Sequence, residues 1–223
     1  MGPRNLVTQM TSLTIRNASL RDTRFIAWAI LTAGRGHLDK GWFDIALALP
    51  ERECLGFLEQ LAQTNVKSWW HFSRFLIADV DGEPAAALCA FTAGEGYSSS
   101  EAAIAEVAHG LSWSESEQSA MWNRAAYMFT CVIDAPEEAW AVENVATLPE
   151  YRGRGLATAL LDRALADGRA ADAKEAHISC LIGNDAARRA YEDAGFTVAE
   201  ERRHPDFESA TGSPGLWRLA RTF

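Results

Sequence analysis

The sequence lacks the segments that would attach it to a membrane or divide it into parts. Its apolar runs are shorter than the roughly 18–20 residues that cross a bilayer, and Met1 to Asn5 carry no apolar stretch typical of a secretion signal. We therefore expect a soluble, cytoplasmic protein that does not bind membranes. No repeat, low-complexity segment or linker interrupts the 223 residues, so a single domain over residues 1–223 is expected.

Cysteine and histidine are too few and too scattered to form a recognisable metal site. The four cysteines include no Cys-x-x-Cys pair, and the five histidines show no His-Glu-x-x-His spacing. Each cysteine has apolar neighbours, which is typical of a small core residue. We expect no bound metal.

Basic residues are almost absent from the middle of the chain. Residues 75–151 contain thirteen acidic residues and one basic residue, Arg124, in a chain of net charge −9. A nucleic-acid-binding protein typically carries a basic stripe, so no nucleic-acid partner is predicted. The acidic stretch either only solvates the surface or favours a cationic small molecule or a basic peptide end.

What the sequence does contain is an alternation of strand and helix patterns. Predicted strands cover residues 13–16, 74–80, 85–91, 140–148, 177–182, 196–200 and 216–219, and predicted helices cover 20–33, 51–64, 99–109, 115–129, 155–168 and 184–194. Capping-box patterns at Ser98-x-x-Glu101 and Ser114-x-x-Glu117 open two helices of an insertion at 95–138. This order predicts a mixed α/β sheet of six or seven strands, with crossover helices between parallel neighbours.

The most informative segment is residues 145–158, where a strand ends at a proline and a glycine-bearing loop leads into a helix. Gly153 and Gly155 let the backbone approach a ligand, and N–H groups at the helix start converge on an anion. Arg152 and Arg154 add positive charge beside this site. The segment lacks the lysine of a P-loop and the third glycine of a dinucleotide fingerprint. An ordinary loop before a surface helix is the alternative.

Two motifs resemble those of the GNAT N-acetyltransferases. Residues Arg152-x-x-Gly155-x-Ala157 match the R/Q-x-x-G-x-G/A signature of this family, and its second conserved stretch is similar to Asn184-x-x-Ala187-x-x-x-Tyr191-x-x-x-Gly195-Phe196. The element order also fits, except that residues 95–138 are longer and more helical than in a minimal member. The resemblance implies an α/β GNAT fold with this helical insertion before the central acetyl-CoA strand. It also implies an acetyl-CoA-dependent N-acetyltransferase that acts on a primary amine without a metal.

The resemblance further implies where acetyl-CoA binds, between the strands at 140–148 and 177–182. Strand backbone would pair with the pantetheine arm, and the loop would hold the pyrophosphate. The implied contacts are Val145, Ala146, Thr147, Arg152, Gly153, Arg154, Gly155, Leu156, Ala157, Thr158, Asn184 and Ala187. Asn184 can equally serve as a helix N-cap.

Two side chains are implied in catalysis by direct attack of the amine on the thioester. Tyr191 corresponds to the family's general acid and would protonate or hydrogen-bond the leaving thiolate, unless it is only a core tyrosine. Glu143 is the candidate base, with a surface carboxylate as the alternative. Its neighbour Asn144 should point to the opposite face, and alternation alone does not decide which of the two lines the cleft. Weaker candidates for the base are Glu138, Asp79 and His71.

The acceptor is expected to be the amine of a small molecule or a peptide. Residues 95–138 and the segments before the hairpin should form its binding wall, with the aromatic residues Trp69, Trp70, Tyr97, Trp113, Trp122 and Tyr127. Aromatic rings among carboxylates favour a cationic amine, although such rings are also typical of a core. A non-catalytic acyl-CoA sensor or interaction module is the alternative function, and a nucleotide-binding α/β domain is a third. A homodimer is left open.

Overall fold

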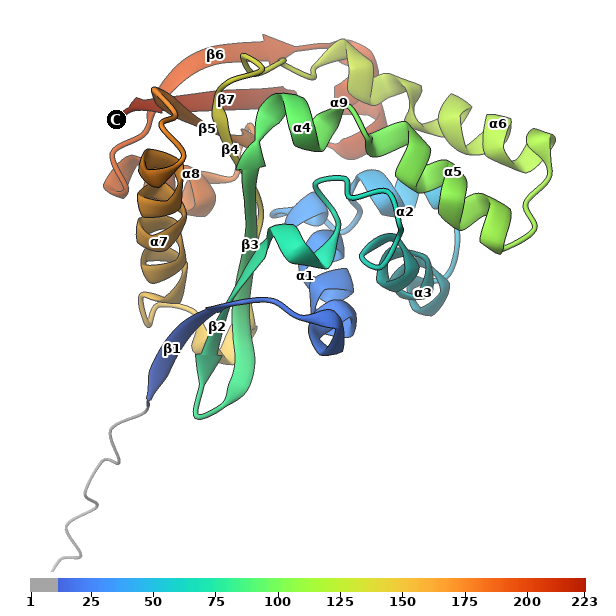
Figure 1. Ribbon diagram of the computed structural model, residues 1–223. Coiled ribbons are helices and arrows are strands. Elements are labelled where there is room, and N and C mark those ends of the chain that lie inside the picture. The colour runs from blue at the N-terminus through green and yellow to red at the C-terminus, as the bar shows by residue number, and fades with distance from the viewer. Residues whose placement is uncertain (1–11) are drawn as a thin grey trace, which may run out of the picture.

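The computed structural model describes residues 12–223, and its elements follow the predicted order (Figure 1). The strands are β1 (Leu13–Asn17), β2 (Phe75–Val80), β3 (Glu83–Thr92), β4 (Trp140–Thr147), β5 (Glu175–Leu181), β6 (Thr197–Arg203) and β7 (Gly215–Thr222). The α-helices are α1 (Thr23–Arg35), α2 (Trp42–Leu47), α3 (Glu51–Leu61), α4 (Ala93–Tyr97), α5 (Ser100–Gly110), α6 (Glu115–Ala125), α7 (Leu156–Ala170), α8 (Asp185–Asp193) and α9 (Pro205–Thr211). Among residues 12–223, no helix combines the length and the apolar character needed to cross a membrane.

The strands form one mixed sheet in the order β1-β2-β3-β4-β5-β7-β6. Every neighbouring pair is antiparallel except β4 and β5, which run parallel and are joined through α7. This confirms the predicted α/β class and the predicted strand number. The position of β7 between β5 and β6 was not predicted, because strand order depends on long-range pairing that local patterns do not contain.

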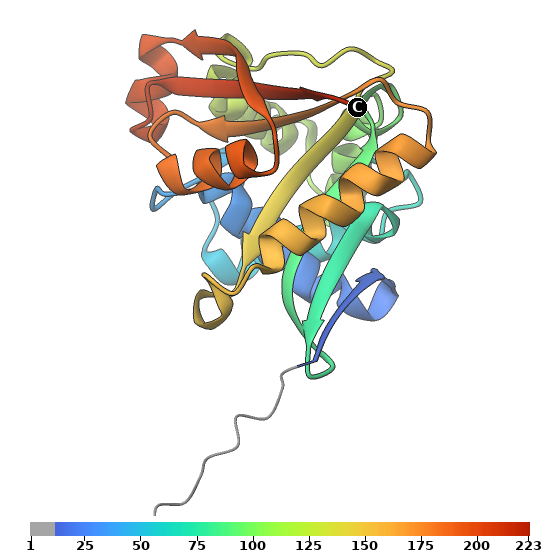
Figure 2. The same ribbon diagram turned by 90° about the vertical axis from the view of Figure 1, so that its left-hand side faces the viewer.

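Helices cover both faces of the sheet and give it two cores. Figure 2 shows α7 lying across one face of the sheet, and helices α1 to α3 lie on the opposite face. The apolar stripe of α7, including Leu160, Leu161 and Leu165, packs with Tyr191 and Phe196. A fully buried leucine contributes about 1.5–3 kcal/mol through the hydrophobic effect. On the opposite face, the second core joins α1, α3 and the insertion to β2 and β3.

The insertion is more broken than the sequence pattern suggested. Its second helix ends at Ala125 and continues as a 3₁₀ segment, Ala126–Thr130. Ser114 and Glu117 form the predicted capping box, but α5 begins at Ser100, so the box predicted at Ser98 is wrong. The short helices α2, α4 and α9 were also not predicted, because too few turns are present for a periodic pattern. In the fold, α5 packs on α3 and α6 packs on α2.

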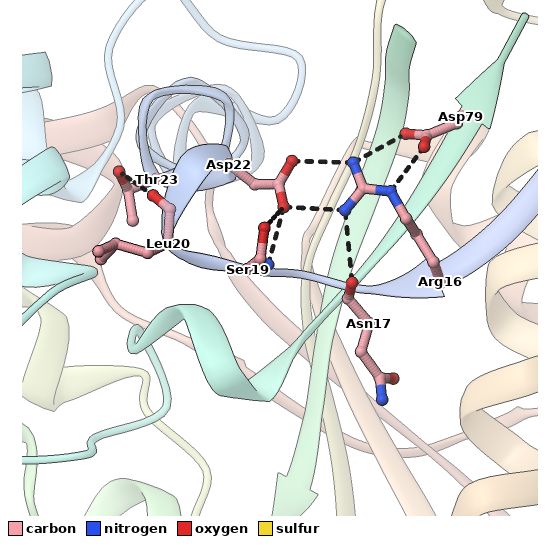
Figure 3. Close-up of polar contacts among 7 residues, drawn as sticks. All are labelled: Arg16, Asn17, Ser19, Leu20, Asp22, Thr23 and Asp79. Atoms are coloured by element: carbon pink, nitrogen blue, oxygen red, sulfur yellow. Dashed lines mark hydrogen bonds and ion pairs between the residues drawn. The ribbon is translucent and has the colours of Figure 1, made fainter. Parts of the chain in front are cut away.

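An arginine near the start of the described chain ties three elements together (Figure 3). The Arg16 guanidinium of β1 contacts Asp22, before α1, at 2.8 Å through both terminal nitrogens. It also contacts Asp79 of β2 at 2.6 and 3.1 Å. The backbone N–H and hydroxyl of Ser19 donate to the same Asp22 carboxylate at 2.7 and 2.8 Å. These donors, with Arg16 foremost, outweigh burial and hold the pKa of Asp22 at about 2.

Candidate active site

The strands β4 and β5 separate after a short stretch of pairing. Only three residue pairs join them, from Trp140 with Ala176 to Val142 with Ile178, although β4 continues to Thr147 and β5 to Leu181. Beyond Val142, the edge of β4 that faces β5 has no strand partner among residues 12–223. An extended ligand can pair with such an edge as an added strand would.

A bulge in β4 changes which side chains face this opening. Ala87 of β3 pairs with Ala146 of β4, and Cys89 pairs with Glu143. Between these two pairs, β3 has one residue, Leu88, whereas β4 has two, Asn144 and Val145. Asn144 has a φ of 55° and donates from its side-chain amide to Cys89 Sγ at 3.4 Å. Because a bulge interrupts the alternation of side chains, both Glu143 and Asn144 line the cavity described below. The expectation that only one of them lines the cleft is therefore wrong.

The loop after β4 exposes backbone donors at the start of α7. Gly153 and Gly155 have φ values of 73° and 79°, in a region that L-residues with side chains rarely adopt. Gly155 is the N-cap of α7, and the first intrahelical bond runs from Ala159 N–H to its carbonyl at 3.0 Å. The N–H groups of residues 156–158 therefore have no helical acceptor and can bind an anion.

These features open into one cavity of about 1260 Å³. It is lined by the two predicted catalytic residues and by every predicted cofactor contact except Arg154. The Arg154 guanidinium instead lies over the Tyr151 ring, 5.1 Å from its centroid. Asn184 is the N-cap of α8, where its side chain accepts a hydrogen bond from the Ala187 N–H at 3.3 Å. Asn184 also lines the cavity. The weaker candidates for the base, Glu138, Asp79 and His71, are outside the lining.

Glu143 is held by a tyrosine of the insertion. The Tyr97 hydroxyl donates to Glu143 Oε1 at 2.7 Å. Loss of hydration raises the pKa of Glu143 above its ordinary value of 4.5, and the Tyr97 hydroxyl and the charge of Arg218 oppose this rise. A carboxylate with a raised pKa is a better proton acceptor at neutral pH than an exposed one.

Tyr191 of α8 lies on the other side of the opening, in the core that contains α7. It is 7% exposed, and burial raises the pKa of its phenol well above 10. The tyrosine is both a core residue and a part of the cavity lining, so the two sequence interpretations are compatible. Its proton stays on the phenol at neutral pH, so the group can donate a hydrogen bond.

Aromatic side chains form much of the remaining wall. Trp42 and Trp70 stack with centroids 6.0 Å apart, and Trp69 meets Tyr97 edge-on at 5.5 Å. Of the six predicted wall aromatics, all but Trp113 line the cavity. Trp113 instead packs on Phe57 in the core, at 5.5 Å. Trp42 also lines the cavity and was not among the predicted aromatic residues, although it lies in the segments before the hairpin.

Several charged residues of the cavity lining were not predicted as site residues from the sequence: Lys40, Glu101, Asp134 and Glu137 are exposed, whereas Arg218 is buried. Arg218 of β7 is 6% exposed and lines the cavity. Its Nε donates to Ser179 Oγ at 3.1 Å, and its Nη1 lies 3.4 Å from His177 Nδ1, both on β5. No signal could have found it, because a lone arginine in a closing strand has no motif. Among residues 12–223, no cluster of three or more His, Cys, Asp or Glu side chains is arranged to hold a metal ion.

Comparison with known proteins gives the class and the family. Residues 45–196 match the model of the Acetyltransferase (GNAT) family. One solved structure, an N-acetyltransferase from Staphylococcus aureus Mu50, is 19% identical, with a TM-score of 0.69 over 93% of this chain and 100% of its own. Another, an acetyltransferase, is 18% identical, with a TM-score of 0.68 over 94% and 98%. No curated protein matches the sequence.

A third structure carries a ligand. It is a putative acetyltransferase from Salmonella typhimurium with its cofactor acetyl-CoA, 16% identical, with a TM-score of 0.51 over 94% of this chain and 93% of its own. At such identities these structures establish the shared fold. The family model covers more than half of the sequence and defines a transferase. The chain belongs to the GNAT acetyltransferase family.

Proposed function

We propose that this protein transfers the acetyl group of acetyl-CoA to the nitrogen of a primary amine. The observation that carries the proposal is the combined opening at β4 and α7. The unpaired edge of β4 suits the amide groups of the pantetheine arm, and the free N–H groups of residues 156–158 suit the pyrophosphate. A cavity of about 1260 Å³ has room for the thioester end and an acceptor together.

Glu143 acts as the base in this proposal, directly or through one water. The amine arrives as an ammonium ion, attracted by the carboxylate and by the aromatic wall, which agrees with the expected cationic acceptor. Loss of its proton to Glu143 frees the nitrogen lone pair. The nitrogen then attacks the thioester carbonyl and loses its second proton to water, and the C–S bond breaks to give the amide and the CoA thiolate.

Tyr191 stabilises that thiolate as a hydrogen-bond donor. Because burial raises the pKa of Tyr191, complete proton transfer to a thiolate is more unfavourable than for an exposed tyrosine. The proposed role is therefore a hydrogen bond in the transition state, and the thiol takes its proton later from solvent.

An enzyme-linked acetyl group on cysteine is disfavoured. Cys180 lines the cavity, but burial raises the pKa of its thiol to about 12. Nearly all of this cysteine is protonated at neutral pH, and the thiolate is the nucleophilic form. Cys54 and Cys89 are also buried, with thiol pKa values raised by burial. Direct transfer fits these surroundings.

The proposal extends to the whole chain as one domain, with residues 95–138 as part of the acceptor wall. A cytoplasmic location and the absence of a nucleic-acid or membrane partner stay predictions from the sequence, and a homodimer stays open. The test is release of free CoA thiol with a panel of amines, read with a thiol reagent and checked by the mass of the acetylated product. Binding of acetyl-CoA without turnover of any amine would favour the non-catalytic sensor instead.

The substitution Tyr191→Phe is expected to lower kcat by about 10- to 100-fold and to leave the Kd of acetyl-CoA within about twofold. Phenylalanine keeps the packing of Tyr191 against the α7 core and removes only the hydroxyl that faces the thiolate. Turnover by thiol release and binding by calorimetry measure the two effects. Unchanged kcat in Tyr191→Phe would remove this residue from the mechanism.

A further inference from the structure

Arg218 is a buried cation without an acidic partner. It is 6% exposed, and among residues 12–223 no carboxylate oxygen lies within the 4.0 Å of an ion pair with its guanidinium. A buried charge that lacks a counter-ion is costly, so such a group is rare unless a ligand completes it. By contrast, Arg16, whose side chain is 21% exposed, has two carboxylates.

The hydrogen bonds of Arg218 leave part of its guanidinium group free for a ligand. Its Nε donates to Ser179 Oγ and its Nη1 to His177 Nδ1. Since arginine only donates, His177 Nδ1 is the acceptor of this hydrogen bond. The Nη2 group has no acceptor within residues 12–223, although Arg218 lines the cavity. Its donors are thus available to an anion there.

Arg218 and Glu143 face the same cavity from strands two places apart. Glu143 is on β4 and Arg218 on β7, with β5 between them. Neighbouring strands lie about 4.8 Å apart, so the two backbones are separated by roughly 10 Å or more. The charge of Arg218 opposes, as the smallest contribution, the rise of the pKa of Glu143, and the two groups form no ion pair within 4.0 Å. Of the charged residues that line the cavity, Lys40, Glu101, Asp134, Glu137 and Arg152 are exposed, whereas Glu143 and Arg218 form a less exposed negative and positive group with a gap between them.

We propose that the acceptor is an amino acid, with its ammonium group at Glu143 and its carboxylate on the Arg218 fork. This inference rests on the proposed N-acetyltransferase function and names its substrate class. A zwitterion fits a gap between opposite charges, and arginine pairs with a carboxylate through two parallel hydrogen bonds. A diamine or polyamine would instead bring a second positive charge toward Arg218.

The neighbours of Arg218 indicate an apolar side chain on that amino acid. Leu216 and Leu181 lie two residues from Arg218 and Ser179 along β7 and β5, on the same face of the sheet. They pack in a cluster with Trp42, Tyr127 and Phe207, and all of these residues line the cavity. This wall suits an aromatic or branched aliphatic side chain.

The test compares amino acids with the amines that lack only their carboxylate. The panel pairs L-phenylalanine with phenethylamine and L-leucine with isopentylamine, and it adds phosphoethanolamine and a diamine. Thiol release gives kcat and KM for the wild type, Arg218→Met and the control Arg202→Met. Arg202 is half-exposed on β6 and outside the cavity. Because no carboxylate forms an ion pair with Arg218 within residues 12–223, its replacement by methionine leaves no buried carboxylate without a counter-ion.

The wild type should prefer at least one amino acid to its decarboxylated partner by roughly 30-fold or more in kcat/KM, mainly through KM. Arg218→Met should abolish this preference, and Arg202→Met should keep it. If Arg218 acts only through the charge of Glu143, its loss lowers kcat equally for both members of a pair, which would overturn the inference. Better turnover of the amines or of phosphoethanolamine than of every amino acid would also overturn it. No thiol release with any acceptor would contradict the proposed function itself.

Discussion

Glu143→Gln is expected to lower kcat by roughly 100-fold or more, the usual contribution of a general base. The amide has nearly the shape of the carboxylate, and it can still accept from Tyr97, but it cannot take a proton from the amine. Turnover should therefore fall while the Kd of acetyl-CoA stays within about twofold. Glu83→Gln is the control, on an exposed carboxylate at the start of β3.

The pH dependence of kcat/KM gives the same prediction a second readout. The base works in its ionised form, so kcat/KM should fall as the pH drops through the pKa of Glu143, which lies above 4.5. This acid limb should vanish in Glu143→Gln. In Tyr97→Phe it should move to higher pH, since the carboxylate loses the hydrogen bond that favours its charged form. An acid limb that is identical in Glu143→Gln would assign the base to another group.

Arg16→Met is expected to lower the free energy of unfolding by about 3 kcal/mol at pH 7. The change leaves the carboxylates of Asp22 and Asp79, which are 3% and 9% exposed, without their shared counter-ion. For a chain of this size the melting temperature should fall by roughly 6–12 °C. Chemical denaturation and calorimetry measure the two quantities. The expected value is near the lower end for buried pairs because the Arg16 side chain is 21% exposed.

The ion pair of Arg16 with Asp22 predicts how the loss of stability in Arg16→Met depends on pH. The pKa of Asp22 is lowered from 3.8 to about 2 in the folded protein, so its stabilisation is complete above about pH 4 and is lost as the pH falls toward 2. The difference between the wild type and Arg16→Met should shrink over that window. Arg163→Met is the control, because its pair with Asp167 is exposed and should contribute less than about 1 kcal/mol. An equal loss of unfolding free energy in Arg16→Met and Arg163→Met would show that the Arg16 cluster contributes no more than an exposed ion pair.

The sequence was most informative where function depends on local backbone chemistry. Residues 145–158 could be interpreted directly, because a strand, a proline, two glycines and a helix start occur within one short stretch. Helix α7 and strands β4 and β5 were likewise predicted to within two residues of their bounds. Each of these elements has a strong pattern of its own.

The missing parts of the prediction depend on contacts between distant residues. Arg218 enters the cavity because β7 inserts beside β5, and neither strand encodes that pairing alone. Tyr97 was expected as one aromatic of the wall, but its bond to Glu143 crosses 46 positions of sequence. The bulge at Asn144 likewise arises from the pairing of β3 with β4. The pairing of distant strands, rather than local composition, determines that Glu143 and Arg218 line the same cavity.

The central claim is that the start of α7 binds acetyl-CoA, and titration of the protein with acetyl-CoA, CoA and NADH tests it most directly. At 100 times its Kd, acetyl-CoA should raise the melting temperature by roughly 5–10 °C, and NADH should have no effect. Gly155→Ala should weaken acetyl-CoA binding about tenfold by straining the loop, whereas Gly82→Ala, with a similar φ of 87° in the β2–β3 turn, should not. No response to acetyl-CoA or CoA, or an equal response to NADH, would contradict the account.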